Sequence, residues 1–80
     1  DLIKIYPNPY IHSLYLENNS QKDVCVEIFN IIGDVIFSQH TILAKSKISI
    51  SELANLKAGL YFLKICNEQS IYPIVKLNGN

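Results

Sequence analysis

The side chains best suited to bind a metal or to move a proton near neutral pH are two histidines, His12 and His40. Neither lies near an acid or a cysteine at a metal-ligand spacing. Asp23, Glu27 and Asp34 fall close together in the sequence, but they lack the spacing of a calcium loop and read as solvated turn acids. The sequence therefore predicts no metal site.

Nucleophilic and phosphate-binding motifs are also missing. The chain has no GxSxG, no HExxH and no glycine-rich phosphate loop, for which its 3 glycines supply little material. We expect a protein that binds no cofactor and is not an enzyme.

The two cysteines, Cys25 and Cys66, belong to no CxxC pair, so zinc and thioredoxin-type motifs are excluded. Both are expected on the face of their strands opposite the core. They could meet only if the two strands are neighbours in one sheet, or through a second copy of the domain. We expect free thiols, with a disulfide as the alternative.

Composition excludes two further classes of function. Seven lysines balance 7 acids, so the chain has no basic surplus with which to bind nucleic acid. No apolar run approaches the roughly 18 residues of a transmembrane segment. If the protein is exported, its signal peptide lies upstream of this sequence, since no signal-like core is seen.

Two surface functions stay open. Asn18-Asn19-Ser20 fits the N-glycosylation pattern, although a polar turn explains it equally well. The chain's 5 tyrosines and 3 phenylalanines could form a carbohydrate-stacking platform. Tyr61 is expected in the core instead, because it shares a strand face with Leu63 and Ile65.

The apolar residues recur with a period of two, which is typical of strands. About seven short strands with polar turns between them predict an all-β fold, an immunoglobulin-like antiparallel β-sandwich formed by residues 1–80 as a single domain. In the last strand, 72–77, Lys76 is expected to point outward between inward-facing Val75 and Leu77. The predicted core comprises Val26, Ile28, Ile48, Ile50, Tyr61, Leu63 and Ile65.

Two segments break the strand pattern. Residues 51–59 look locally helical, with Ser51 as a cap and Gly59 as the end, and one turn of 3₁₀ or α structure is expected. In Tyr6-Pro7-Asn8-Pro9, each proline fixes φ and holds the preceding residue extended. This stretch predicts an edge strand that breaks and continues on the other sheet.

Taken in order, these pieces resemble the type IX secretion system C-terminal sorting domain, the Por secretion system sorting domain (type A) of Bacteroidetes-type bacteria. The resemblance covers nearly the whole chain. Its residues are Tyr6, Pro7, Asn8 and Pro9 in the proline kink, Gly33 and Ile36 at the mid-domain turn, and Leu56, Gly59, Tyr61 and Ile65 in the third motif. Lys76 corresponds best to the family's C-terminal lysine.

The resemblance implies a role in protein export rather than catalysis. Such domains lie at the C-terminus of larger exported proteins and direct the attached upstream cargo through an outer-membrane translocon. A sortase-like protease then usually removes them, and the cargo is released or anchored at the cell surface. The implied partners are the translocon, the sortase and the cargo. The route runs through the periplasm to the cell surface or the medium.

The last strand departs from the family pattern. Pro73 weakens ladder pairing there and predicts an edge strand, and the tail 78–80 extends past Lys76. The alternative interpretation is a non-catalytic immunoglobulin-like accessory domain, binding carbohydrate or spacing other domains of an extracellular protein. Such a domain would present an exposed aromatic row.

Overall fold

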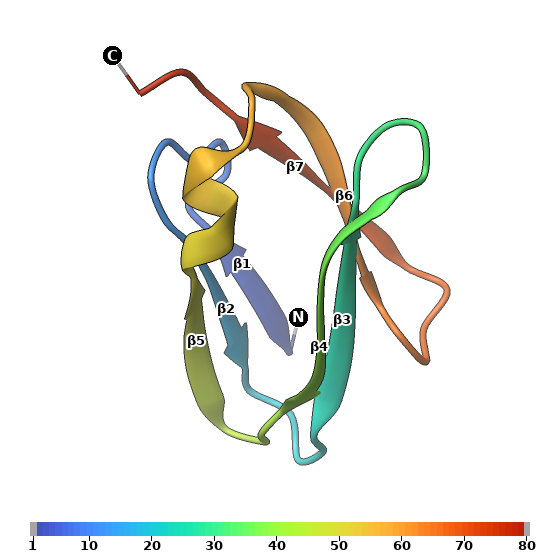
Figure 1. Ribbon diagram of the computed structural model, residues 1–80. Coiled ribbons are helices and arrows are strands. Elements are labelled where there is room, and N and C mark those ends of the chain that lie inside the picture. The colour runs from blue at the N-terminus through green and yellow to red at the C-terminus, as the bar shows by residue number, and fades with distance from the viewer. Residues whose placement is uncertain (1, 80) are drawn as a thin grey trace.

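The computed structural model describes residues 2–79 and folds them into two facing β-sheets joined at their edges by loops (Figure 1). The elements in chain order are β1 (Ile3–Tyr6), β2 (Leu14–Asn18), β3 (Val24–Phe29), β4 (Val35–Ile42), β5 (Ser46–Ile50), the 3₁₀ helix η1 (Ser51–Asn55), β6 (Gly59–Ile65) and β7 (Ile71–Lys76).

Every strand pairing is antiparallel. One sheet has three strands in the order β1-β2-β5, and the other has four in the order β4-β3-β6-β7. The predicted all-β sandwich is confirmed. The edge position of β7 is also confirmed, which explains how Pro73 is tolerated there without a backbone donor.

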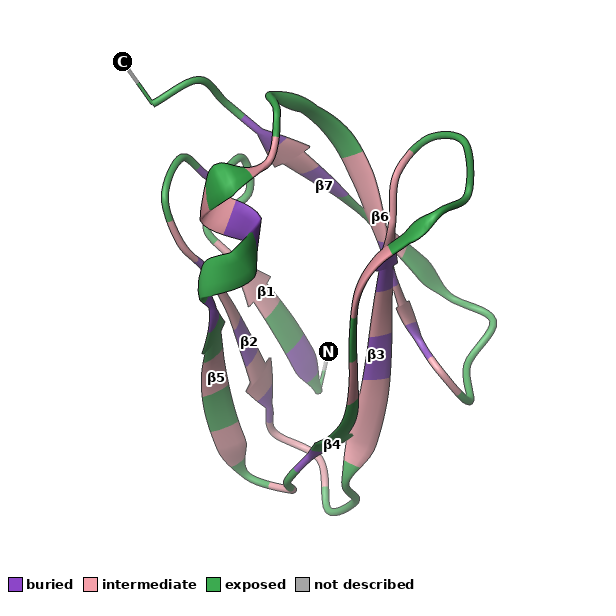
Figure 2. Cartoon of the chain, in the orientation of Figure 1, coloured by how far each residue is buried: buried purple, intermediate pink, exposed green. Residues whose placement is uncertain are grey.

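The core lies between the sheets and is built by alternation along the strands, as the buried bands of Figure 2 show. Of the predicted core, Val26, Ile28, Ile50, Leu63 and Ile65 are buried. Ile48 and Tyr61 are only half-buried and pack against this core. Tyr61 lies at the rim because its hydroxyl donates to the Lys57 carbonyl, 2.7 Å away.

The predicted single helical turn is confirmed as the 3₁₀ helix η1, but its predicted boundaries are wrong. Ser51 is the first helical residue, and the N-cap position before it is taken by Ile50. Gly59 does not end the helix but opens β6. The helix is held by its buried Leu53, which closes one end of the core.

The prediction of free thiols is wrong. Cys25 and Cys66 form a disulfide, with their Cα atoms 5.4 Å apart. Cys25 lies on β3 and Cys66 directly follows its neighbour β6, and the Cys66 amide donates to the Cys25 carbonyl at 3.0 Å. The outward orientation of both cysteines was predicted, and the neighbouring strands bring them within bonding range.

Candidate functional site

The proline kink carries the chain from one sheet to the other. β1 pairs with β2 as far as Tyr6, and after the two prolines Tyr10 forms a parallel bridge with Lys76 of β7. The Tyr10 amide donates to the Val75 carbonyl at 2.9 Å, and the Leu77 amide donates to the Tyr10 carbonyl at 2.8 Å. The predicted change of sheet is therefore confirmed.

Asn8, between the two prolines, extends this contact with its side chain. Its amide nitrogen donates to the Pro73 carbonyl at 2.8 Å, and its amide oxygen accepts from the Val75 amide at 3.0 Å. The amide thus takes the place of a strand residue on the outer edge of β7. We name residues 8–10 and 73–77 together the terminal clasp.

Tyr10 anchors the terminal clasp in the core. It is fully buried, and its hydroxyl donates to the Leu53 carbonyl of η1 at 3.0 Å. Burial, with a smaller contribution from nearby Tyr61, raises the pKa of Tyr10 to about 12, because the phenolate would lose its hydration. The residue therefore acts as a neutral donor under physiological conditions.

The predicted orientation of Lys76 is wrong. Lys76 and Ile74 point into the sandwich, whereas Val75 is half-buried and Leu77 is exposed. The register explains this, because Lys76 lies opposite Gly59, which has no side chain to occupy the inner face. Only 6% of Lys76 is exposed.

The ammonium group of Lys76 nevertheless finds polar partners. It donates to the Leu77 carbonyl at 2.8 Å and lies 5.7 Å from the centre of the Tyr10 ring. The long apolar stem thus fills space in the core while the charge reaches its rim. Lys76 is a structural part of the clasp.

Most of the third predicted motif joins the same end of the sandwich. Gly59 and Tyr61 pair with Lys76 and Ile74 of β7, and Leu56 packs against the core. Gly59 has φ 153°, a conformation that favours glycine. Ile65 is buried at the far end of β6.

The middle motif lies apart from the clasp, in the hairpin that joins β3 to β4. Gly33 has φ 95° at its tip, and Ile36 packs half-buried against the core. The structure therefore places the predicted motif residues in two regions, the clasp end and this hairpin.

Comparison with families of known proteins identifies the group to which the chain is related. Residues 4–77 match the family described as a secretion system C-terminal sorting domain. The chain belongs to this family. No curated protein and no solved structure is significantly similar to it.

Membership in this family gives the domain its general function. It is a sorting signal of type IX secretion, a non-catalytic class of domain found on exported proteins of Bacteroidetes, with the cargo attached upstream. In residues 2–79, no helix is long and apolar enough to cross a membrane.

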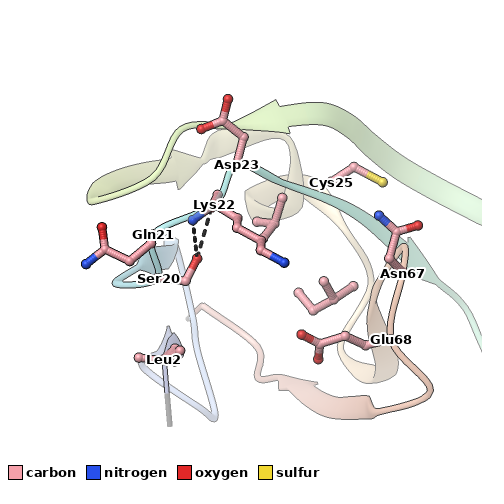
Figure 3. A pocket seen from close by; sticks show the side chains of 10 residues that line it. Leu2, Ser20, Gln21, Lys22, Asp23, Cys25, Asn67 and Glu68 are labelled. Carbon is pink, nitrogen blue, oxygen red and sulfur yellow. Dashed lines mark hydrogen bonds between the residues drawn. The ribbon is translucent and has the colours of Figure 1, made fainter.

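A hollow of about 510 Å³ lies at the end of the sorting domain opposite the terminal clasp (Figure 3). Its lining includes Lys22, Glu68 and Ile65. Asp23 points away from it, and its carboxylate accepts from the Ala44 amide at 2.8 Å. The lining brings charges of both signs to an open site but no pairing of a nucleophile with a base.

The titratable residues of the sorting domain stay dispersed. Within residues 2–79, no three side chains of His, Cys, Asp or Glu gather closely enough to hold a metal ion. His12 and His40 are exposed, one in the loop after the kink and the other on β4.

Asn18 has a structural role that favours the polar-turn interpretation over glycosylation. Its side chain is fully buried, and its amide donates to the carbonyls of Ile42 and Leu43 at 3.0 and 3.1 Å. Its oxygen accepts from the Ser20 hydroxyl. Asn18 thus ties the β2–β3 loop to the β4–β5 corner, and a glycan could not be attached without unfolding this corner.

A pair of aromatic rings lies on the outside of the three-stranded sheet. Tyr6 and Tyr15 stack with their centres 5.8 Å apart, and the Tyr6 hydroxyl donates to the Glu17 carboxylate. The Lys47 ammonium lies 5.9 and 5.3 Å from the two ring centres. Because the domain's own lysine lies over both rings, they do not form an open platform for sugar stacking.

Proposed function

We propose that residues 1–80 are the single C-terminal sorting domain of a larger exported protein, and that they direct the attached cargo through the type IX outer-membrane translocon. A sortase-like protease then removes the domain, and the cargo is released or anchored at the cell surface. The observation that carries this proposal is the family match over residues 4–77.

The proposal assigns the motif residues an indirect role. Tyr6, Pro7, Asn8 and Pro9 form the change of sheet, and Gly59 and Tyr61 pair with Lys76 and Ile74 of the terminal clasp. These residues are mostly engaged with the domain itself. We therefore assign them to building the folded unit that the translocon reads, rather than to contacting the translocon directly.

The test is a secretion assay in a type IX-competent host. A reporter with a signal peptide at its N-terminus and this chain at its C-terminus should reach the medium or the cell surface. The same fusion should stay in the periplasm of a strain that lacks the translocon. Retention of the fusion in the competent strain would contradict the proposal.

Removal of the domain is tested on the exported reporter. Intact mass should show a reporter without residues 1–80 when the sortase is present, and a reporter that keeps them when it is deleted. An exported reporter that keeps the domain in both strains would refute the cleavage step while leaving the sorting function in place.

A further inference from the structure

The two outer faces of the sandwich differ in chemistry. On the three-stranded sheet, the outward residues of β1 and β2 are Lys4, Tyr6, Tyr15 and Glu17, and Lys47 projects from β5. On the four-stranded sheet the outward residues are mainly apolar. Only the second face has the character of a protein-binding surface.

An apolar row crosses the four-stranded sheet from edge to edge. Val35 on β4 lies opposite Phe29 on β3, Phe29 lies opposite Phe62 on β6, and Phe62 lies opposite Pro73 on β7. The neighbouring pair Leu60 and Val75 extends it. Residues directly opposite each other share a face, so these side chains form one continuous surface.

The β3–β4 hairpin continues this surface beyond the sheet. At its tip, Ile31 and Ile32 are 72% and 79% exposed. The tip is well ordered, because the Asn30 carboxamide oxygen accepts from the amides of Ile32 and Asp34 at 3.2 and 2.9 Å. Two consecutive isoleucines are thus fixed in solvent.

A hollow of about 290 Å³ lies between the tip and the sheet. Phe29, Ile31, Phe62 and Ile71 form most of its lining. Ile71, at the start of β7, is 54% exposed. The protruding Ile31–Ile32 tip therefore lies beside an apolar hollow.

The charges on this face are internally compensated. Glu27 on β3 lies directly opposite Lys64 on β6. The same row ends in Ser38 on β4 and Ile71 on β7, which carry no charge. Electrostatic complementarity therefore calls for an uncharged, apolar partner surface.

The size of the face determines how much additional surface its occupant must cover. Four strands of about six residues cover roughly 400 Å² in the plane of the sheet, from the usual strand spacing and rise. A stable interface buries about 800 Å² on each partner. A partner that contacts the sheet alone falls short of this area, so the partner must also enclose the protruding tip.

We propose that the outer face of the four-stranded sheet, with the Ile31–Ile32 tip, docks into a concave, uncharged apolar groove on a protein of the export machinery. This inference rests on the proposed sorting function and names the surface through which it acts. The tip enters the groove, and an apolar side chain of the partner fills the hollow beside Phe29 and Phe62. Burial of exposed aliphatic side chains provides the binding free energy.

The test places a charge on this surface and measures secretion of the reporter fusion. Ile32→Asp and Ile71→Asp should each lower secretion at least tenfold. Leu43→Asp is the matched control, because Leu43 is 59% exposed at the β4–β5 turn, away from this face. All three variants should keep the melting temperature of the wild type, since the substituted side chains are largely in solvent.

The outcomes separate this inference from the sorting function. Secretion of both isoleucine variants at the level of the Leu43→Asp control would overturn the docking surface alone. Retention of the wild-type fusion would overturn the sorting function and the docking surface with it. A different outcome would be a dimer in analytical ultracentrifugation that Ile32→Asp dissociates. That result would assign the face to a second copy of the chain and overturn the proposed partner from the export machinery.

Discussion

At the residue scale, the domain buries polar groups only where they have partners. Within the described residues, no buried side-chain nitrogen or oxygen lacks a hydrogen bond. Tyr10, Asn18 and Lys76 are the clearest cases, since each is almost fully buried and each bonds a backbone carbonyl. Because an unpaired buried polar group is costly, these three residues help to specify one arrangement of the loops around the core.

The raised pKa of Tyr10 predicts alkaline destabilisation. The folded pKa of about 12 lies above the unfolded value of 10.0, so this contribution is complete below pH 10 and is lost as the pH rises towards 12. By pH 12 the loss should reach about 2 kcal/mol. Urea unfolding between pH 8 and 12 should show it in the wild type and not in Tyr10→Phe. Parallel pH profiles would contradict it.

The buried stem of Lys76 predicts that two substitutions change the free energy of unfolding by different amounts. Lys76→Met keeps a long apolar side chain and should change the free energy of unfolding by less than about 1.5 kcal/mol. Lys76→Ala leaves space beside Gly59 and Tyr10 and should cost about 2 kcal/mol or more. Thermal unfolding of the two variants checks this. If alanine is tolerated as well as methionine, the stem does not contribute to the packing.

At the element scale, the sequence predicts strands well and their partners poorly. Alternation was sufficient to orient β3, where Val26 and Ile28 were expected in the core and are buried. In β7 both faces carry apolar residues, so the pattern did not fix which one is buried, and the register with β6 decided it. The disulfide and the terminal clasp depend on which strands are neighbours, and that information is not local.

The two hydrogen bonds of the Asn8 side chain to β7 can be tested with a single substitution. Asn8→Ala removes both bonds to the edge of β7 and should lower the free energy of unfolding by about 1–2 kcal/mol. The Val75 amide should then exchange its hydrogen faster. Asn67→Ala, in the exposed β6–β7 turn, is the control and should change neither quantity. Unchanged exchange at Val75 would show that the edge is held without Asn8.

At the scale of the whole molecule, both ends of β6 are linked to neighbouring segments. β6 begins beside the terminal clasp, where Gly59 pairs with Lys76, and ends beside the disulfide. The clasp joins segments near the two ends of the chain, whereas Cys25 and Cys66 join the two central strands of the four-stranded sheet. Both links therefore involve the four-stranded sheet whose outer face we propose as the docking surface.

The disulfide should therefore stabilise the domain as a whole. It closes a loop of 41 residues that contains β4, β5 and η1, and a loop of this length corresponds to about 4 kcal/mol in the chain-entropy account. Such a contribution is a large share of the stability of a small domain. Intact mass of the oxidised chain should be two hydrogens lower than that of the reduced chain.

Denaturant unfolding with and without reductant measures this contribution. Reduction should lower the free energy of unfolding of the wild type by a few kcal/mol, while the double variant Cys25→Ser, Cys66→Ser should be equally stable in both conditions. Because the hydrogen bonds of the clasp and the packing of the core do not involve the disulfide, the reduced domain should still fold in the absence of denaturant. Complete unfolding on reduction would mean that the clasp and the core cannot hold the sandwich together without the covalent link.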